Sequence, residues 1–227
     1  MEERKFVKVQ KDEFAIREFV KNLFGKGKVS NIKIEYTPVG EKIVVSTHKP
    51  GLIIGKGGEK IEKLTEILRK KFKMENPHIE IDEIREPDLD AKLVADDIAL
   101  SLERLGPLKF KVIGYKTLQR IKYAGGLGAE IRLSGRLPSE RAKSWRFAFG
   151  YLKKTGDSSK VVDHAQATGY TSKGVVGVKV SILRPDAHIH DKVELTEDLM
   201  NKIRGNAAFK EEEEIKPKKK KKKEVSE

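Results

Sequence analysis

The 227-residue sequence predicts an α+β fold in two domains, on three observations. The first 88 residues follow the order helix, strand, strand, helix, helix, strand. A second set of helical and strand patterns begins after Pro87 and continues to about residue 204. The length is also sufficient for two domains that each bury a core. We therefore expect domains at 1–88 and 89–204, followed by a charged tail at 205–227.

The first part opens with a predicted helix and a β-hairpin. Apolar side chains recur at helical spacing over residues 12–24 and stop at Gly25-Lys26-Gly27, which is typical of a helix C-cap. Alternating apolar residues predict a strand over 29–36 and a second strand at 43–45. The turn between them contains Pro38-Val39-Gly40, as expected for a hairpin.

A glycine-rich segment follows the hairpin, and it contains Gly55-Lys56-Gly57-Gly58. This fits the GxxG loop with which KH modules clamp a single-stranded nucleic-acid backbone. Glycine permits unusual backbone dihedrals and lets sugar and phosphate approach the main chain, while Lys56 adds a positive charge. The spacing fits neither a Walker loop nor a dinucleotide-binding loop. We expect RNA contacts at Gly55, Lys56, Gly57 and Gly58.

The flanks of this loop support the KH interpretation. Ile53 and Ile54 precede it, and apolar residues follow at helical spacing from Ile61 to Phe72. Asn76-Pro77 ends that helix, and alternating isoleucines predict a third strand near 79–84. The resulting order is that of the prokaryotic-type, or type II, KH domain.

The second part is predicted to be an α/β domain with a mixed sheet. A helix follows Pro87-Asp88-Leu89-Asp90 and runs to Leu105, and another spans about 107–123. We interpret the glycines at 125–128 as a helix cap and turn, because the next five residues alternate like a strand. Further strands are predicted at 160–168 and 175–183.

Positive charge is concentrated in one central segment. The whole chain has 48 Lys and Arg against 35 Asp and Glu, a formal charge of +13. Residues 103–160 contain 14 basic and 4 acidic side chains, a difference of +10, whereas residues 1–102 contain 20 and 19, a difference of +1. Such an excess suits a polyanionic partner.

We expect the basic residues of this segment to bind RNA, mainly through phosphates. On an ideal helix, three of them lie within about 40° of one another and form a ridge: Lys109, Lys116 and Arg120. Aromatic residues are interleaved with the later basic residues, and we expect most of these rings to pack in the core. The predicted contacts are Lys109, Lys111, Lys116, Arg120, Arg132, Arg136, Arg141, Lys143 and Arg146.

Several other classes of protein are disfavoured. Without cysteine there is no disulfide, thiolate zinc site or cysteine nucleophile. Neither a signal peptide nor a membrane span is recognisable, so we expect no membrane partner. His188 and His190 beside Asp191 are interpreted as exposed loop residues, and Asp88 and Asp90 as helix-capping residues. We expect no metal, no cofactor and no catalytic residues.

The C-terminal segment changes composition at Gly205. Glu211–Glu214 is followed by Lys218–Lys223, and such charged blocks cannot bury enough apolar surface to offset chain entropy. We expect the tail at 205–227 to be disordered when unbound and to make loose phosphate contacts.

Three separate segments resemble one family. They are Gly51-Leu52-Ile53-Ile54-Gly55-Lys56-Gly57-Gly58, then Glu130-Ile131-Arg132-Leu133-Ser134-Gly135-Arg136-Leu137 with Arg141-Ala142-Lys143, and Val175-Val176-Gly177-Val178-Lys179-Val180. Together, in this order, they resemble the universal small-subunit ribosomal protein S-three family in its archaeal and eukaryotic style.

The resemblance implies a structural constituent of the small ribosomal subunit, cytoplasmic and ribosome-bound. Its implied partners are ribosomal RNA in the subunit head, mRNA where it enters the subunit, and the tenth and fourteenth proteins of that subunit. Bacterial relatives unwind mRNA with a basic cluster on the helix corresponding to 107–123, whereas here Val112, Gly114 and Tyr115 interrupt the basic residues. Two alternatives remain: a free KH-domain RNA-binding protein or RNA chaperone, and a lyase on damaged DNA, an activity associated with eukaryotic relatives.

Overall fold

The computed structural model describes residues 2–38, 40–72, 74, 76–189 and 200. The chain divides into two units, Met1–His188 and Ile189–Glu227. The predicted tail at 205–227 and the predicted loop residue His190 lie outside the described residues. The architecture below is therefore that of the first unit.

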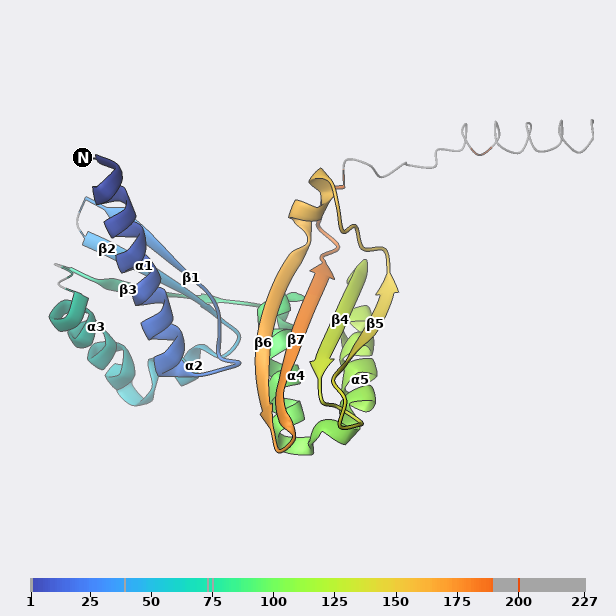
Figure 1. Cartoon of the computed structure of the whole chain (residues 1–227). Coiled ribbons are helices and arrows are strands. Elements are labelled where there is room, and N and C mark those ends of the chain that lie inside the picture. Colours follow the sequence, from blue (N-terminus) through green and yellow to red (C-terminus); the bar gives the residue numbers. More distant parts are fainter. Residues whose placement is uncertain (1, 39, 73, 75, 190–199, 201–227) are drawn as a thin grey trace, which may run out of the picture. The chain divides into compact units, whose positions relative to one another are not determined.

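The first part of this unit has the predicted order of elements. They are α1 (Glu2–Phe24), β1 (Val29–Thr37), β2 (Gly40–Thr47), α2 (Pro50–Ile54), α3 (Glu59–Phe72) and β3 (His78–Glu83). The strand order is β1-β2-β3 (Figure 1). β2 pairs antiparallel with β1 and parallel with β3, so that Ile43 lies beside Ile34 and Ile79. This mixed sheet and its helices confirm the type II KH order.

Helix α1 begins ten residues before the predicted start at residue 12. The reason is that the sequence prediction followed the buried stripe, which consists of Ile16, Val20 and Phe24. Residues 3–12 are all exposed, including Phe6 at 73%. Core periodicity therefore carries no signal over the first three turns.

The core of the first part lies between the helices and the sheet. Ile16 and Val20 of α1 pack in one cluster with Leu64 of α3 and with Ile43 and Val45 of β2. All five are 4% exposed or less. This packing fixes α3, and with it the glycine loop at the N-terminal end of α3.

The second part contains two helices followed by four strands. They are α4 (Ala91–Leu105), α5 (Phe110–Tyr123), β4 (Gly128–Gly135), β5 (Lys143–Gly150), β6 (Asp163–Thr171) and β7 (Gly174–Leu183). The strand order is β5-β4-β7-β6, and every pairing is antiparallel. Figure 1 shows α4 and α5 behind this sheet, with its other face toward the viewer.

Two details of the sequence prediction were wrong here. The second sheet is antiparallel and not mixed, because both α-helices precede the strands and, within residues 128–183 of the described chain, no α-helix crosses over to return a strand in parallel. Strand β5 was not predicted. Its interleaved basic and aromatic residues, taken as a binding signal, are the two-residue period of a strand, with Phe147 buried and Arg146 exposed.

The helices cover the apolar face of the second sheet. Ala95, Ile98 and Leu102 of α4 pack in one cluster with Ile131 of β4 and Val180 of β7. Leu105, predicted to lie on the apolar face of this helix, is instead 54% exposed. The opposite face of the sheet carries the alternate residues of each strand.

Candidate nucleic-acid interface

The glycine loop has a backbone that favours glycine. It joins α2 to α3 through a single 3-10 turn at Lys56–Gly58. Gly55, Gly57 and Gly58 have φ values of 77°, 62° and 86°, all in the region that side chains with a Cβ seldom adopt. A Cβ added at Gly57 or Gly58 would meet nothing within 4 Å, so the outer side of the loop is open. The loop can therefore admit a sugar-phosphate backbone close to its main chain.

The charge around this loop is nearly balanced. Lys56 is exposed, whereas the Lys60 ammonium donates to the Leu52 carbonyl at 3.1 Å. Glu59, at the start of α3, forms an ion pair with Lys63, and the hydrogen bond from Lys63 lowers the pKa of the Glu59 carboxyl. The loop therefore offers a nucleic acid an open main chain at Gly57 and Gly58 and the exposed ammonium group of Lys56.

The predicted ridge on the second helix is only partly formed. Lys109 lies in the 3-10 turn Pro107–Lys109 before α5, so the helical angle assumed for it does not apply. Lys116 is exposed on α5, and the Lys111 ammonium lies 5.0 Å from the centre of the Trp145 ring. These three cations have no carboxylate partner among the residues that the structure describes.

Arg120, the third member of the ridge, is held by two carboxylates. Its Nε donates to Asp88 Oδ1 at 3.1 Å and its Nη1 donates to Asp97 Oδ2 at 2.8 Å. The hydrogen bond to Asp88, reinforced by Asp97, raises the pKa of the guanidinium. Its charge is therefore locally compensated, which makes it the weakest candidate for an RNA contact in the predicted set.

Two other predicted cations share a carboxylate that the sequence prediction did not single out. Arg132 and Arg146 face each other across β4 and β5, and both form ion pairs with Glu130, at 3.1 and 3.0 Å. Lys154 adds a third contact at 2.6 Å. A signal was present, because Glu130 and Arg132 are two apart on a strand and so lie on one face.

The remaining predicted cations lie at the connection between β4 and β5. Arg136, Arg141 and Lys143 are exposed, and none has a carboxylate partner within the described ranges. Lys143 is opposite Gly135 in the strand register, which places it at the end of the hairpin. These side chains keep their full charge for a ligand.

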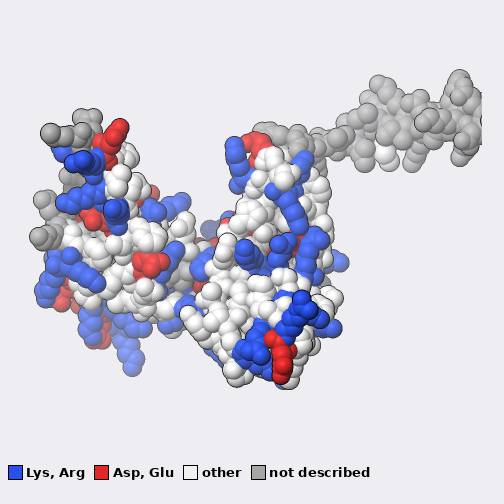
Figure 2. Space-filling model, viewed as in Figure 1, with Lys and Arg blue, Asp and Glu red and all other residues white. Residues whose placement is uncertain are grey.

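The structure thus divides the predicted cations between two faces of the second sheet. Helix α5 covers one face, and its lysines lie on that side. Arg132 and Arg146 occupy the opposite, helix-free face, beside which Figure 2 shows many blue and few red side chains. A nucleic acid on one face would not contact all of the predicted residues at once.

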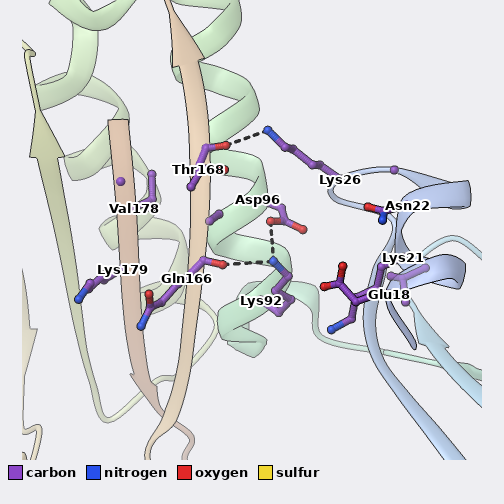
Figure 3. A pocket seen from close by; sticks show the side chains of 14 residues that line it. Glu18, Lys21, Asn22, Lys26, Lys92, Asp96, Gln166, Thr168, Val178 and Lys179 are labelled. Carbon is purple, nitrogen blue, oxygen red and sulfur yellow. Dashed lines mark hydrogen bonds and ion pairs between the residues drawn. The ribbon is translucent and has the colours of Figure 1, made fainter. Parts of the chain in front are cut away.

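A cleft of about 470 Å³ lies at the edge strand β6, where residues 18–29 approach α4 (Figure 3). Lys26 donates to the Thr168 carbonyl at 2.8 Å, and Lys92 donates to the Gln166 carbonyl at 3.2 Å. Lys92 also pairs with Asp96 at 3.0 Å. These lysines satisfy outward-facing carbonyls of an edge strand, a position otherwise open to pairing with another chain. The contacts of Lys26 and Lys92 are therefore structural, whereas Gln166 and Lys179, which also line this cleft, lie beside each other in the register of β6 and β7 on the helix-free face.

The acidic and histidine residues have structural explanations. Asp90 is the N-cap of α4 and accepts hydrogen bonds from the Lys92 and Leu93 amides, as predicted. Asp88 binds Arg120 instead of capping. His164 Nδ1 lies 2.8 Å from Ser181 Oγ. Within the described residues no cluster of side chains could hold a metal ion, and no helix has the length and apolarity to cross a membrane.

Comparison with known families gives two matches. The family model described as "KH domain" matches residues 15–89, and the model described as "Ribosomal protein S3, C-terminal domain" matches residues 98–182. The second match includes every predicted cation outside the glycine loop.

Individual relatives match over most of the chain, and each is named small ribosomal subunit protein uS3. The protein from Methanocaldococcus jannaschii is 40% identical over 199 residues, which cover 87% of this chain and 95% of the relative. The protein from Halobacterium salinarum is 39% identical over 83% of this chain and 61% of its own length. That from Haloarcula marismortui is 36% identical over 87% and 65%.

Proposed function

Because the chain belongs to the family of small ribosomal subunit protein uS3, we propose that it is an RNA-binding structural constituent of the small ribosomal subunit. Its partners are then ribosomal RNA and neighbouring ribosomal proteins, and it works bound to the ribosome in the cytoplasm. The observation that carries this proposal is the match of a KH domain and an S3 C-terminal domain, in that order, on one chain.

We further propose that the second part supplies most of the affinity for ribosomal RNA in the subunit head. Five exposed cations support this, because they have no carboxylate partner among the described residues: Lys109, Lys116, Arg136, Arg141 and Lys143. Phosphate contacts from such side chains release counterions and dominate affinity. Lys111, over the Trp145 ring, is exposed as well.

The glycine loop is assigned a different role, contact with mRNA where it enters the subunit. The open outer side of Gly57 and Gly58 and the near-neutral surroundings suit a geometric contact with a passing single strand. We place the tenth and fourteenth proteins of the subunit beside this chain on the family resemblance alone.

The proposed role is structural and not catalytic. A lyase that forms a Schiff base needs a lysine with a lowered pKa. Lys42 shows the opposite shift, since its hydrogen bond to Glu80 raises the pKa of the ammonium. The lyase alternative predicts a covalent adduct on borohydride trapping with damaged DNA, whereas the structural role predicts none under conditions in which a control lyase is trapped.

Sedimentation of a cell lysate tests the proposal. The tagged full chain should follow the small subunit through a sucrose gradient and remain with it at moderate salt. A chain that stays near the top of the gradient while still binding RNA would instead be a free KH protein or RNA chaperone.

Limited proteolysis tests the proposed division into 1–88, 89–204 and 205–227, with early cleavage expected after residue 204.

A further inference from the structure

The helix-free face of the second sheet carries a row of polar side chains across all four strands. In the strand register, Arg146 of β5 lies opposite Arg132 of β4, which lies opposite Lys179 of β7, which lies opposite Gln166 of β6. All four residues are exposed. We call these residues the cross-strand row. It spans three strand spacings of about 4.8 Å each, so its cations can reach more than one phosphate of a strand.

A buried carboxylate lies beside this row. Glu130 is 7% exposed, and it faces the same side of β4 as Arg132, two residues on. Arg132 Nη2 binds Oε1, while Arg146 Nε and Lys154 Nζ bind Oε2. Three cations against one carboxylate leave a local charge of +2. The side chains of the three cations remain 49%, 57% and 50% exposed, so they are anchored at one end and accessible at the other.

The surroundings of Glu130 favour the charged form of its carboxylate. Burial raises the pKa of the Glu130 carboxyl, but the ion pairs with Lys154 and Arg146 outweigh burial and hold the pKa below its usual value. Each arginine uses only part of its guanidinium on Glu130, since Arg132 is bound through Nη2 and Arg146 through Nε. The other N–H groups keep the planar donor geometry that suits phosphate oxygens.

The rest of this face suits a nucleic-acid backbone better than a protein. Five of the eight residues that flank the cross-strand row in the register are small, namely Ala148, Ser181, Ser144, Ser134 and Gly177, and the other three are Glu130, His164 and Thr168. Among the described residues of these strands, the large exposed apolar side chains on this face lie at one end, where Tyr170 is opposite Val175. A stable protein interface needs a central apolar or aromatic anchor, whereas a phosphate backbone needs cations and room to approach.

We propose that the helix-free face of the second sheet is a binding site for an RNA phosphate backbone, in which Arg132, Arg146 and Lys179 contact phosphates. Glu130 is a positioning residue that holds both arginines and Lys154 in place before the RNA arrives. The proposal rests on the proposed function. It adds a location, three residues outside the predicted set (Lys179, Glu130 and Lys154) and a reason for a buried acid in a basic surface.

Substitution of the row in the full chain tests the location. The variant R132Q/R146Q/K179Q should bind a transcript of the small-subunit ribosomal RNA about 10- to 100-fold more weakly, and the slope of log K against log salt should become shallower by about 2. The matched control R104Q/K122Q/K173Q removes the same charge from exposed residues of the same part. Equal losses in both triple variants would reduce the effect to net charge and overturn the proposal.

Substitution of Glu130 tests the positioning role, because the two explanations predict opposite signs. Glu130→Gln raises the net charge by one, so a purely electrostatic surface would bind RNA more tightly. Positioning predicts binding several-fold weaker at constant salt, and R132K/R146K should also weaken it although charge is kept. Circular dichroism and thermal melting verify that each variant is folded. Tighter RNA binding by folded Glu130→Gln would overturn the role.

Two further outcomes separate this site from the general function. Suppose that the wild-type chain sediments with the small subunit and that R132Q/R146Q/K179Q binds the transcript as tightly as the wild-type chain does. The proposed binding site is then wrong, while the proposed function stands. If the triple variant loses binding to poly-glutamate but keeps its RNA affinity, the face binds an acidic protein and the RNA site is wrong. Failure of the wild-type chain to bind the transcript would overturn both.

Discussion

Glycine residues serve two different purposes in this chain. In the loop, Gly57 and Gly58 are required by backbone conformation, and their outer sides are open. Gly114 has an ordinary helical backbone and is required by space, because an added Cβ would lie 2.9 Å from the Phe147 ring. The apparent break in the basic pattern of this helix therefore has a packing cause. It lets α5 approach β5 closely.

Gly114→Ala should destabilise the fold by about 1–3 kcal/mol, since the buried Phe147 ring must move to admit a methyl group. Chemical denaturation monitored by circular dichroism measures the change. The double variant G114A/F147L should be less destabilised than the sum of its single changes. Strict additivity of the two single changes would contradict direct contact as the cause.

The Glu130 carboxyl should make stability depend on pH. Its folded-state pKa lies below the value of 4.5 expected without the fold, so its charged form stabilises the protein at neutral pH. That contribution is lost as the pH falls below about 4.5 and through the folded-state pKa. Glu130→Gln should thus be less stable than wild type at pH 7, and the difference should shrink below about pH 4.5.

Melting temperatures between pH 3 and pH 8 measure this effect. Glu140→Gln removes an exposed carboxylate from the same part of the chain and serves as the control. If the melting temperatures of wild type and Glu130→Gln differ by the same amount at every pH, the charge of Glu130 does not stabilise the fold, and the substitution acts through packing.

At the scale of elements, we propose separate roles for the glycine loop and for the basic surface of the second part. The loop is held between α2 and α3 by packing in the first core, and its surroundings are nearly neutral. The predicted cations of the second part lie on α5, β4 and β5, in the turn before α5 and in the connection between β4 and β5. Damage to the loop should therefore weaken contact with mRNA and leave assembly into the subunit intact.

The variant K56D/G57D tests this separation. It should sediment with the small subunit as wild type does, while ultraviolet cross-linking between the chain and mRNA on the ribosome is reduced several-fold. The variant K8D/Q10D makes the same charge change on exposed residues of α1 and should leave the cross-link unchanged. Loss of assembly with the cross-link preserved would reverse the assignment.

The sequence predicted those elements whose signals are local. The KH order, helix α4 and its N-cap at Asp90 follow from apolar periodicity and turn residues, and the structure confirms them. The start of α1 was missed because its first turns bury nothing. Strand β5 was missed because the same alternation of basic and aromatic residues fits both a strand and a binding segment.

The candidate site was less predictable, because partners are set by tertiary structure. Sequence composition identified the basic segment. It could not show that Arg120 is compensated by Asp88 and Asp97, because these carboxylates lie 32 and 23 residues away along the chain. Nor could it show that Glu130 gathers Arg146 and Lys154 across a hairpin. Charge density is visible in a sequence, whereas charge pairing over long separations is not.

At the scale of the whole molecule, the glycine loop and the excess positive charge lie in different segments of the chain. Residues 1–102 have a net charge of +1 and contain the glycine loop, while residues 103–160 have a net charge of +10 and contain every other predicted contact. This division of charge predicts that residues 103–160 anchor the chain to ribosomal RNA.

The salt dependence of binding by the full chain tests this claim most directly. Neutralising five unpaired cations of the second segment to Gln, at Lys109, Lys116, Arg136, Arg141 and Lys143, should make the slope of log K against log salt for small-subunit ribosomal RNA shallower by about 3 or more. Neutralising five exposed cations of the first part, at Lys5, Lys8, Lys11, Lys33 and Arg69, should change the slope by less than about 1. An equal or larger change in the second variant would contradict the account.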